Sequence, residues 1–209
     1  MKSGVNEFAK VAIMAEDNVL NALEFCKSIH DPYYICKGYA VIATKETDPS
    51  KKFKYLSESI KASNGVKDVI HRSLVLAWPL RELARTNADK LIKKTIREIL
   101  DFTKRKKGTI EYLDQLIYLI GALAIGNKEN FDVIYNELLA ECKLCDHNKK
   151  DIALSQLIPF VDKVSPAYAN ELLFLIDGDK PRKKAEKNLQ REAKKDINSY
   201  FLDLQFKSI

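Results

Sequence analysis

The chain has 209 residues and a formal net charge of +6, with 46% hydrophobic and 31% charged residues but only seven Gly and six Pro. This composition excludes a disordered chain and a many-stranded sheet, and it predicts one continuous all-α domain over residues 1–209. The four Cys at positions 26, 36, 142 and 145 are too few and too uneven for a disulfide framework, so we expect reduced thiols.

The longest uncharged apolar run, LIYLIGALAI at residues 116–125, has about half the length that a membrane-spanning helix requires. It therefore predicts a buried core helix and no transmembrane segment. Residues 1–16 form a predicted N-terminal helix and carry no secretory leader pattern. We expect a cytoplasmic protein.

Polar residues followed by Pro or by good helix formers predict where helices begin. They are Asp31-Pro32, Asp48-Pro49, Asn87-Ala88, Asn127-Lys128, Ser165-Pro166 and Asp179-Lys180-Pro181. Between them, apolar residues recur at spacings of three and four, as in an amphipathic helix. The predicted helices cover 19–29, 32–44, 49–62, 66–84, 88–102, 109–124, 128–142, 149–161 and 166–176, and a long helix starts near residue 181.

The first predicted pair of helices meets at Asp31-Pro32, a corner that also carries Tyr33 and Tyr34. Periodicity makes Cys36 a core residue rather than a nucleophile. Gly38, Ala40 and Ala43 are small residues that permit close helix approach.

Pro79 lies inside the predicted helix 66–84, where it removes one backbone hydrogen bond. We expect the helix to kink or restart near Trp78. Trp78, with His71 two turns before it, is a candidate anchor for a protein or peptide ligand, as are Tyr33 and Tyr34. The alternative for a lone Trp is a core position.

The predicted pairs open at Asp17, Pro49, Ala88, Lys128 and Pro166, in steps of 32, 39, 40 and 38 residues. This spacing and the pattern A-L-x-x-C-x-x-I-x-D-P-x-x-x-x-x-G-Y-A-x-I-A at residues 22–43 resemble the helical-repeat class of tetratricopeptide and HEAT arrays. The resemblance implies a right-handed stack of about five antiparallel hairpins over residues 17–176. A non-repetitive bundle is the alternative.

Residues 177–209 form a predicted basic helix whose apolar stripe, which includes Leu189, Ala193 and Ile197, covers the last hairpin. A cap explains this stripe better than a membrane-surface helix does.

The positive charge is concentrated in residues 90–107 and 180–195, each with a local balance of +6. The rest of the chain is therefore mildly acidic. The residues that would contact a polyanion are Lys93, Lys94, Arg97, Lys104, Arg105, Lys106, Lys107, Lys180, Arg182, Lys183, Lys184, Lys187 and Arg191. The alternative is a solvated surface.

Cys142, Cys145 and His147 are weak candidates for a metal or redox site, because a closed zinc site needs a fourth ligand. The two Cys also end a predicted helix, where its dipole disfavours a thiolate, so structural packing is the favoured interpretation.

No catalytic or cofactor motif occurs, and only three His are present. We therefore expect no cofactor. The leading hypothesis is a non-enzymatic adaptor that binds a protein or peptide. RNA or DNA binding through the basic segments is the alternative, and a metal- or thiol-dependent enzyme is the third.

Overall fold

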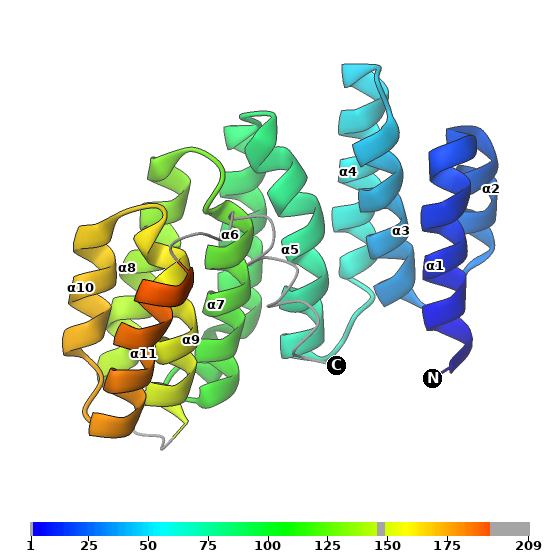
Figure 1. The fold of residues 1–209 in the computed structure, drawn as a ribbon. Helices are drawn as coiled ribbons and strands as arrows, with labels where there is room; N and C mark the ends of the chain where they lie inside the picture. Colours follow the sequence, from blue (N-terminus) through cyan, green and yellow to red (C-terminus); the bar gives the residue numbers. More distant parts are fainter. Residues whose placement is uncertain (1, 146–148, 193–209) are drawn as a thin grey trace. The chain divides into compact units, whose positions relative to one another are not determined.

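The computed structural model describes residues 2–145 and 149–192, and all regular structure within these ranges is helical (Figure 1). The prediction of an all-α chain is thereby confirmed. Contacts divide the chain into two compact units, Met1–Thr95 and Ile96–Ile209, and each is described by itself. The single domain, the number of hairpins and the handedness of the stack stay predictions.

The first unit contains five complete helices and the start of a sixth. They are α1 (Lys2–Asp17), α2 (Val19–Ser28), α3 (Pro32–Lys45), α4 (Pro49–Ser63), α5 (Val69–Arg85) and the beginning of α6 (Asp89–Thr103). Helix α3 is central, because it contacts α1, α2, α4 and α5. Helices α1 and α5 both pack on α3. Helix α2 contacts α1 and α3, and helix α4 contacts α3 and α5. The helices therefore alternate between two layers, with α1, α3 and α5 in one and α2 and α4 in the other.

Side-chain caps begin these helices where local chemistry predicts them. Asp31 accepts a hydrogen bond from Tyr33 N at 2.9 Å, and Asp48 accepts from Ser50 N at 2.8 Å. Each is followed by Pro in the first turn, where the missing N–H costs no intrahelical bond. The predicted starts at Asp31 and Asp48 are confirmed.

Asn87 does not begin α6 but ends α5, which corrects the prediction made from Asn87-Ala88. Its φ of 52° is left-handed. Ala88 N donates to Leu83 O and Asn87 N donates to Ala84 O, which is the double closure of a Schellman motif. Asn is among the few residues with a side chain that adopt this conformation readily.

Pro79 does not interrupt α5, which runs continuously from Val69 to Arg85. Of the kink or restart predicted near Trp78, the restart is therefore wrong, and the kink stays a prediction. Pro79 has no N–H to donate to the carbonyl of Val75, four residues earlier. Cys36 Sγ, on α3, donates to that oxygen at 3.6 Å, and Cys36 is fully buried. A neighbouring helix thus supplies the bond that the proline removes.

Gly38 lets α2 and α3 pack closely, as its small size predicts. A Cβ added at Gly38 would lie 2.7 Å from Cys26 Sγ and 3.5 Å from Val11 Cγ1, and Cys26 is itself fully buried. The first distance is too short for two non-bonded atoms in a packed core.

We expect Gly38→Ala to lower the free energy of unfolding by about 1–2 kcal/mol, because overpacking outweighs the gain of roughly 1 kcal/mol in helix propensity. In a Cys26→Ala background the sulfur is gone, so the same change should be neutral or stabilising. Urea unfolding of the four proteins in this double-mutant cycle measures the coupling. An equal cost in both backgrounds would show that Cys26 does not set the spacing.

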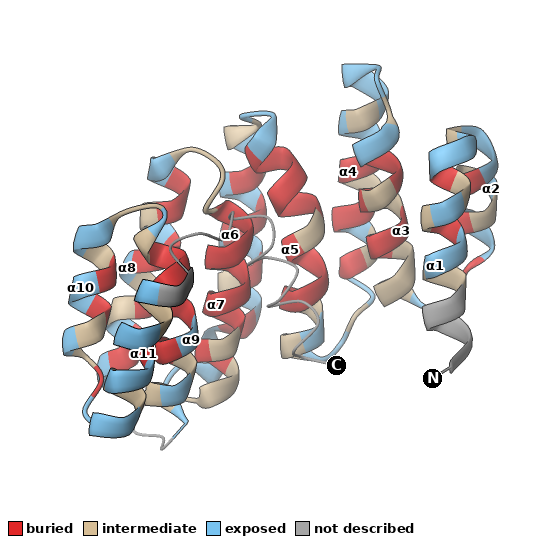
Figure 2. Cartoon of the chain, viewed as in Figure 1, coloured by how far each residue is buried: buried red, intermediate tan, exposed pale blue. Residues whose placement is uncertain are grey.

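The second unit contains the end of α6, the short 3-10 helix η1 (Lys104–Lys106), α7 (Ile110–Leu123), α8 (Lys128–Leu144), α9 (Lys150–Asp162), α10 (Pro166–Phe174) and α11 (Asp179–Glu192). Helix α7 carries most of the apolar run of residues 116–125, and Figure 2 shows it buried along much of its length. The predicted core helix is confirmed. Helix α9 contacts α7, α10 and α11.

A second interior proline is compensated in the same way as the first. Pro159 lies inside α9 and leaves the carbonyl of Ser155 without its helical donor. Asn188 Nδ2, on α11, donates to Ser155 O at 3.5 Å. Helix α11 therefore packs on α9 over the proline. Ala193 and Ile197 of the predicted capping stripe lie outside the described residues, so the cap stays a prediction.

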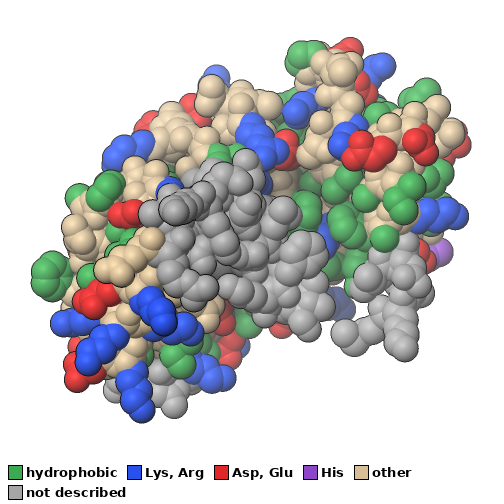
Figure 3. Space-filling view, in the orientation of Figure 1, with side chains coloured by type: hydrophobic (Ala, Val, Ile, Leu, Met, Phe, Trp, Pro, Cys, Tyr) green, Lys and Arg blue, Asp and Glu red, His purple; other side chains and the backbone are tan. Residues whose placement is uncertain are grey.

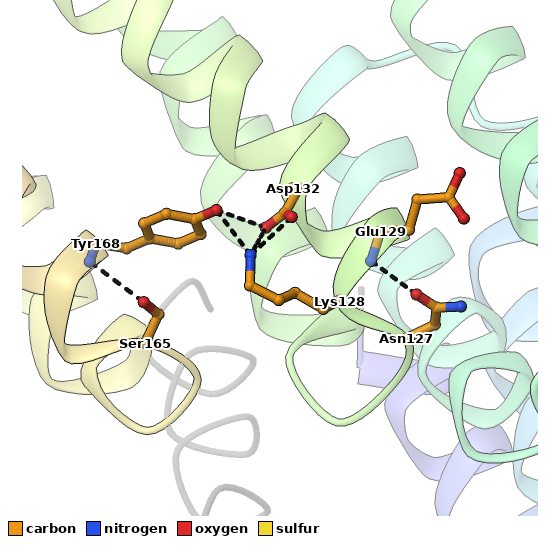
Figure 4. A network of polar contacts seen from close by, with 6 residues as sticks. All are labelled: Asn127, Lys128, Glu129, Asp132, Ser165 and Tyr168. Atoms are coloured by element: carbon orange, nitrogen blue, oxygen red, sulfur yellow. Dashed lines mark hydrogen bonds and ion pairs between the residues drawn. The ribbon is translucent and has the colours of Figure 1, made fainter.

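A polar network joins α8 to α10 (Figure 4). Lys128 Nζ donates to both carboxylate oxygens of Asp132 at 2.7 Å and to the Tyr168 hydroxyl at 2.8 Å. The Tyr168 ring stacks on Tyr135 with centroids 4.1 Å apart. Asn127 and Ser165 cap the two helices, as predicted.

Candidate functional site: a lysine surrounded by aromatic rings

Lys37 is a buried lysine on the central helix of the first unit. It lies on α3, one turn after Tyr33, and only 6% of its surface is exposed. A lysine at such a position normally keeps its ammonium group in water or beside a carboxylate. Lys37 is therefore an unexpected residue at a buried position.

Aromatic rings from three helices surround the ammonium group. Lys37 Nζ lies 4.4 Å from the ring centroid of Phe8 on α1, 4.9 Å from that of Trp78 on α5 and 5.6 Å from that of Tyr33 on α3. Each distance is within the range at which the negative face of a ring attracts a cation. We call these four residues the Lys37 cage.

Two further side chains border the cage. The Tyr33 ring makes edge contacts with Tyr34, at a centroid distance of 5.2 Å, and with His71, at 6.1 Å. His71 is exposed, whereas Phe8, Tyr33, Tyr34 and Trp78 are half-buried. We call Tyr34 and His71 the outer pair.

No anion among the residues that the structure describes offsets the charge of Lys37. Within the described part of the chain, no hydrogen bond or ion pair joins Lys37 Nζ to an oxygen atom. Burial lowers the pKa of the Lys37 ammonium group to about 8, because the charged form loses hydration, and the neighbouring Cys36 opposes this shift. The cage thus holds a cation whose three N–H donors have no oxygen acceptor among the described residues.

The structure brings together all four residues that the sequence suggested for peptide binding. Tyr33 and Trp78 are part of the cage, and Tyr34 and His71 form the outer pair. Sequence reasoning missed Lys37 and Phe8. One local signal existed for Lys37, because it follows Tyr33 by four residues and so shares its helix face.

The first basic segment is exposed along most of its length. Lys93, Lys94 and Arg97 are exposed on α6, and Lys104, Arg105 and Lys106 are exposed in η1. Lys107 is also exposed and forms an ion pair with Glu137 on α8 at 2.6 Å. Gly108 N donates to Glu141 Oε1 at 2.6 Å, so the end of this loop is attached to α8.

Helix α11 presents an exposed row of lysines. Lys180, Lys183, Lys184 and Lys187 are all exposed, and their spacing of three and four residues places them on one face. Figure 3 shows Lys and Arg side chains gathered over this helix. Arg182 is half-buried and donates to Ile176 O at 2.8 Å, and the side chain of Arg191 lies outside the described residues, as do Lys194 and Lys195.

The two cysteines of the suggested metal or redox site are buried in the second unit. Cys142 is 4% exposed and Cys145 is 1% exposed. Burial raises the pKa of the Cys142 thiol to about 12, so this residue is a thiol at neutral pH. The structure does not describe His147, so the predicted three-residue set is not tested.

Comparison with protein-family models, with curated proteins and with solved structures finds no match to this chain. None of the described helices is both long enough and apolar enough to cross a membrane. The case for a function therefore depends on the geometry of the two surfaces described above.

Proposed function

We propose that the chain is a non-enzymatic helical-repeat adaptor that binds a protein or peptide partner at the Lys37 cage and the outer pair. The observation that carries the proposal is the convergence of Phe8, Tyr33 and Trp78, from three helices, on the ammonium group of Lys37. Half-exposed Tyr and Trp side chains with polar tips are the residues that dominate binding energy in protein interfaces.

The position of the cage supports this proposal. Helices α1, α3 and α5 belong to one layer of the first unit, and each contributes a ring. Figure 3 shows hydrophobic side chains gathered over α1 and α3 on the visible face. In a stack of helical hairpins, such a layer is an extended surface suited to a peptide.

A pull-down from native lysate tests the proposal. Wild-type protein should retain a stoichiometric partner, and the Tyr34→Ala, His71→Ala double variant should lose most of it, because these side chains border the cage without filling the core. Phe53→Ala, which removes an exposed aromatic side chain on α4, is the matched control and should retain the partner. Absence of any partner, or equal retention by all three proteins, would contradict the proposal.

RNA or DNA is the alternative partner, and the row of four exposed lysines on α11 favours it. Such a row can follow a phosphate backbone, with affinity that falls steeply as salt rises. In gel-shift titrations at two salt concentrations, changing Lys180, Lys183, Lys184 and Lys187 to Gln should reduce the salt slope by about three to four. Lys107→Gln is the control, because Glu137 already pairs with Lys107. No binding of wild-type protein at low salt would remove this alternative.

A further inference from the structure

The chemistry of Lys37 restricts what a partner must present. Its ammonium group has three N–H donors, and aromatic faces attract the charge but provide no oxygen lone pair. A buried charge that lacks a hydrogen-bonded counter-ion is costly. Because Lys37 is 6% exposed and has no oxygen partner within the described residues, an anionic oxygen brought by a ligand would offset that cost.

The surroundings of the cage favour an anion with one charge. Asp31 begins α3 and Asp68 begins α5, beside Tyr33 and His71, and each accepts a backbone hydrogen bond at its helix start. Asp68 also lies 3.2 Å from His71 Nδ1. These two carboxylates, beside Tyr33 and His71, would repel a phosphate or a run of acidic residues, whereas one carboxylate matches the one cation of Lys37.

The arrangement of the rings indicates what flanks that carboxylate. Phe8, Trp78 and Tyr33 come from three different helices, so apolar contact surface lies on more than one side of Lys37. A side chain in the interior of a peptide has neighbours on both sides, whereas a chain terminus has a neighbour on one side only. The geometry therefore suits an internal Asp or Glu between apolar residues.

We propose that the partner places a single side-chain carboxylate, flanked by apolar residues, on the ammonium group of Lys37. This inference rests on the proposed adaptor function and adds the chemistry of the partner. The carboxylate accepts the N–H bonds that no described residue accepts, and the flanking residues cover the exposed edges of the cage.

Selection from a random nine-residue peptide library displayed on phage tests the inference. The library is selected in parallel on wild-type protein and on Lys37→Met, which keeps the length of the side chain without its charge. Wild-type protein should enrich sequences with one Asp or Glu between apolar residues, and Lys37→Met should not enrich them. Enrichment of sequences without an acidic residue would overturn the inference but leave the adaptor function standing, whereas no enrichment at all would contradict both.

An enriched peptide, synthesised with both ends blocked, provides the quantitative measurement. Changing its acidic residue to the corresponding amide should weaken binding to wild-type protein by about thirtyfold or more, as expected when one member of a buried charge pair is lost. The same change should have little effect on binding to Lys37→Met. Equal losses on both proteins, or binding that requires a free peptide C-terminus, would overturn the assignment.

Discussion

Replacing Lys37 by Met is expected to raise the free energy of unfolding at pH 7 by about 1–3 kcal/mol. Burial lowers the pKa of this ammonium group from its ordinary value of 10.5 to about 8. This lowering of the pKa corresponds to a free-energy cost of about 3 kcal/mol for the charged form in the folded chain, and the attraction of the rings to the cation offsets part of that cost. Met keeps apolar contact with the rings of Phe8 and Trp78 and needs no hydration.

The increase in unfolding free energy caused by Lys37→Met should become smaller as the pH rises above 8. Between pH 8 and 10.5 the unfolded chain holds the Lys37 proton more tightly than the folded chain, so wild-type stability contributed by this group rises with pH. The advantage of Lys37→Met should therefore shrink across that range. Guanidinium unfolding of both proteins at several pH values measures it.

Lys51→Met is the control for this experiment, because Lys51 is exposed on α4 and its replacement should change stability by less than about 0.5 kcal/mol. If Lys37→Met were destabilising at pH 7, the ammonium group would contribute more to the fold than its burial costs. A purely structural role for the cage would then be the better interpretation. If Lys37→Met is instead more stable than wild-type protein and no longer selects acidic peptides, the charge of Lys37 serves binding and not the stability of the fold.

Sequence reasoning placed the helices well because their signals are local. The caps at Asp31 and Asp48 need only the following residues, and the apolar period of α7 is visible in a single segment. The predicted helix start at Asn87 is wrong because its signal is also local: Asn suits both a helix start and a left-handed helix end. The bonds from Ala88 to Leu83 and from Asn87 to Ala84 decide between the two.

The candidate site was predicted in part. The sequence points to Tyr33 and Tyr34 at a helix corner, to Trp78 beside a proline and to His71 two turns before Trp78. Nothing in the sequence shows that the four residues meet. Phe8, Lys37 and Trp78 are brought together only by the packing of α1 and α5 on α3. Likewise, the sequence alone suggests that Lys107 is a free cation, whereas in the structure Lys107 pairs with Glu137 on α8.

The hydrogen bond from Cys36 to Val75 gives the other large expected effect. Cys36→Ala should lower the free energy of unfolding by about 2–4 kcal/mol, because it removes a fully buried sulfur and leaves the Val75 carbonyl unpaired beside Pro79. Cys36 Sγ also lies 3.3 Å from Ser59 Oγ, on α4, so the substitution affects the junction of α3, α4 and α5. Urea unfolding measures the loss.

A Pro79→Ala background should reduce that loss by about 1–2 kcal/mol. Alanine restores an N–H at position 79, which can donate to Val75 O in the ordinary helical pattern, so the carbonyl no longer depends on Cys36. Cys26→Ala is the matched control, because Cys26 is an equally buried cysteine whose Sγ donates to Ile35 O instead. The loss of unfolding free energy caused by Cys26→Ala should be independent of Pro79→Ala, so the effects of the two substitutions should be additive within about 0.5 kcal/mol. If the Cys36 and Pro79 substitutions were also additive, the thiol would be filling space and not replacing the donor that the proline lacks.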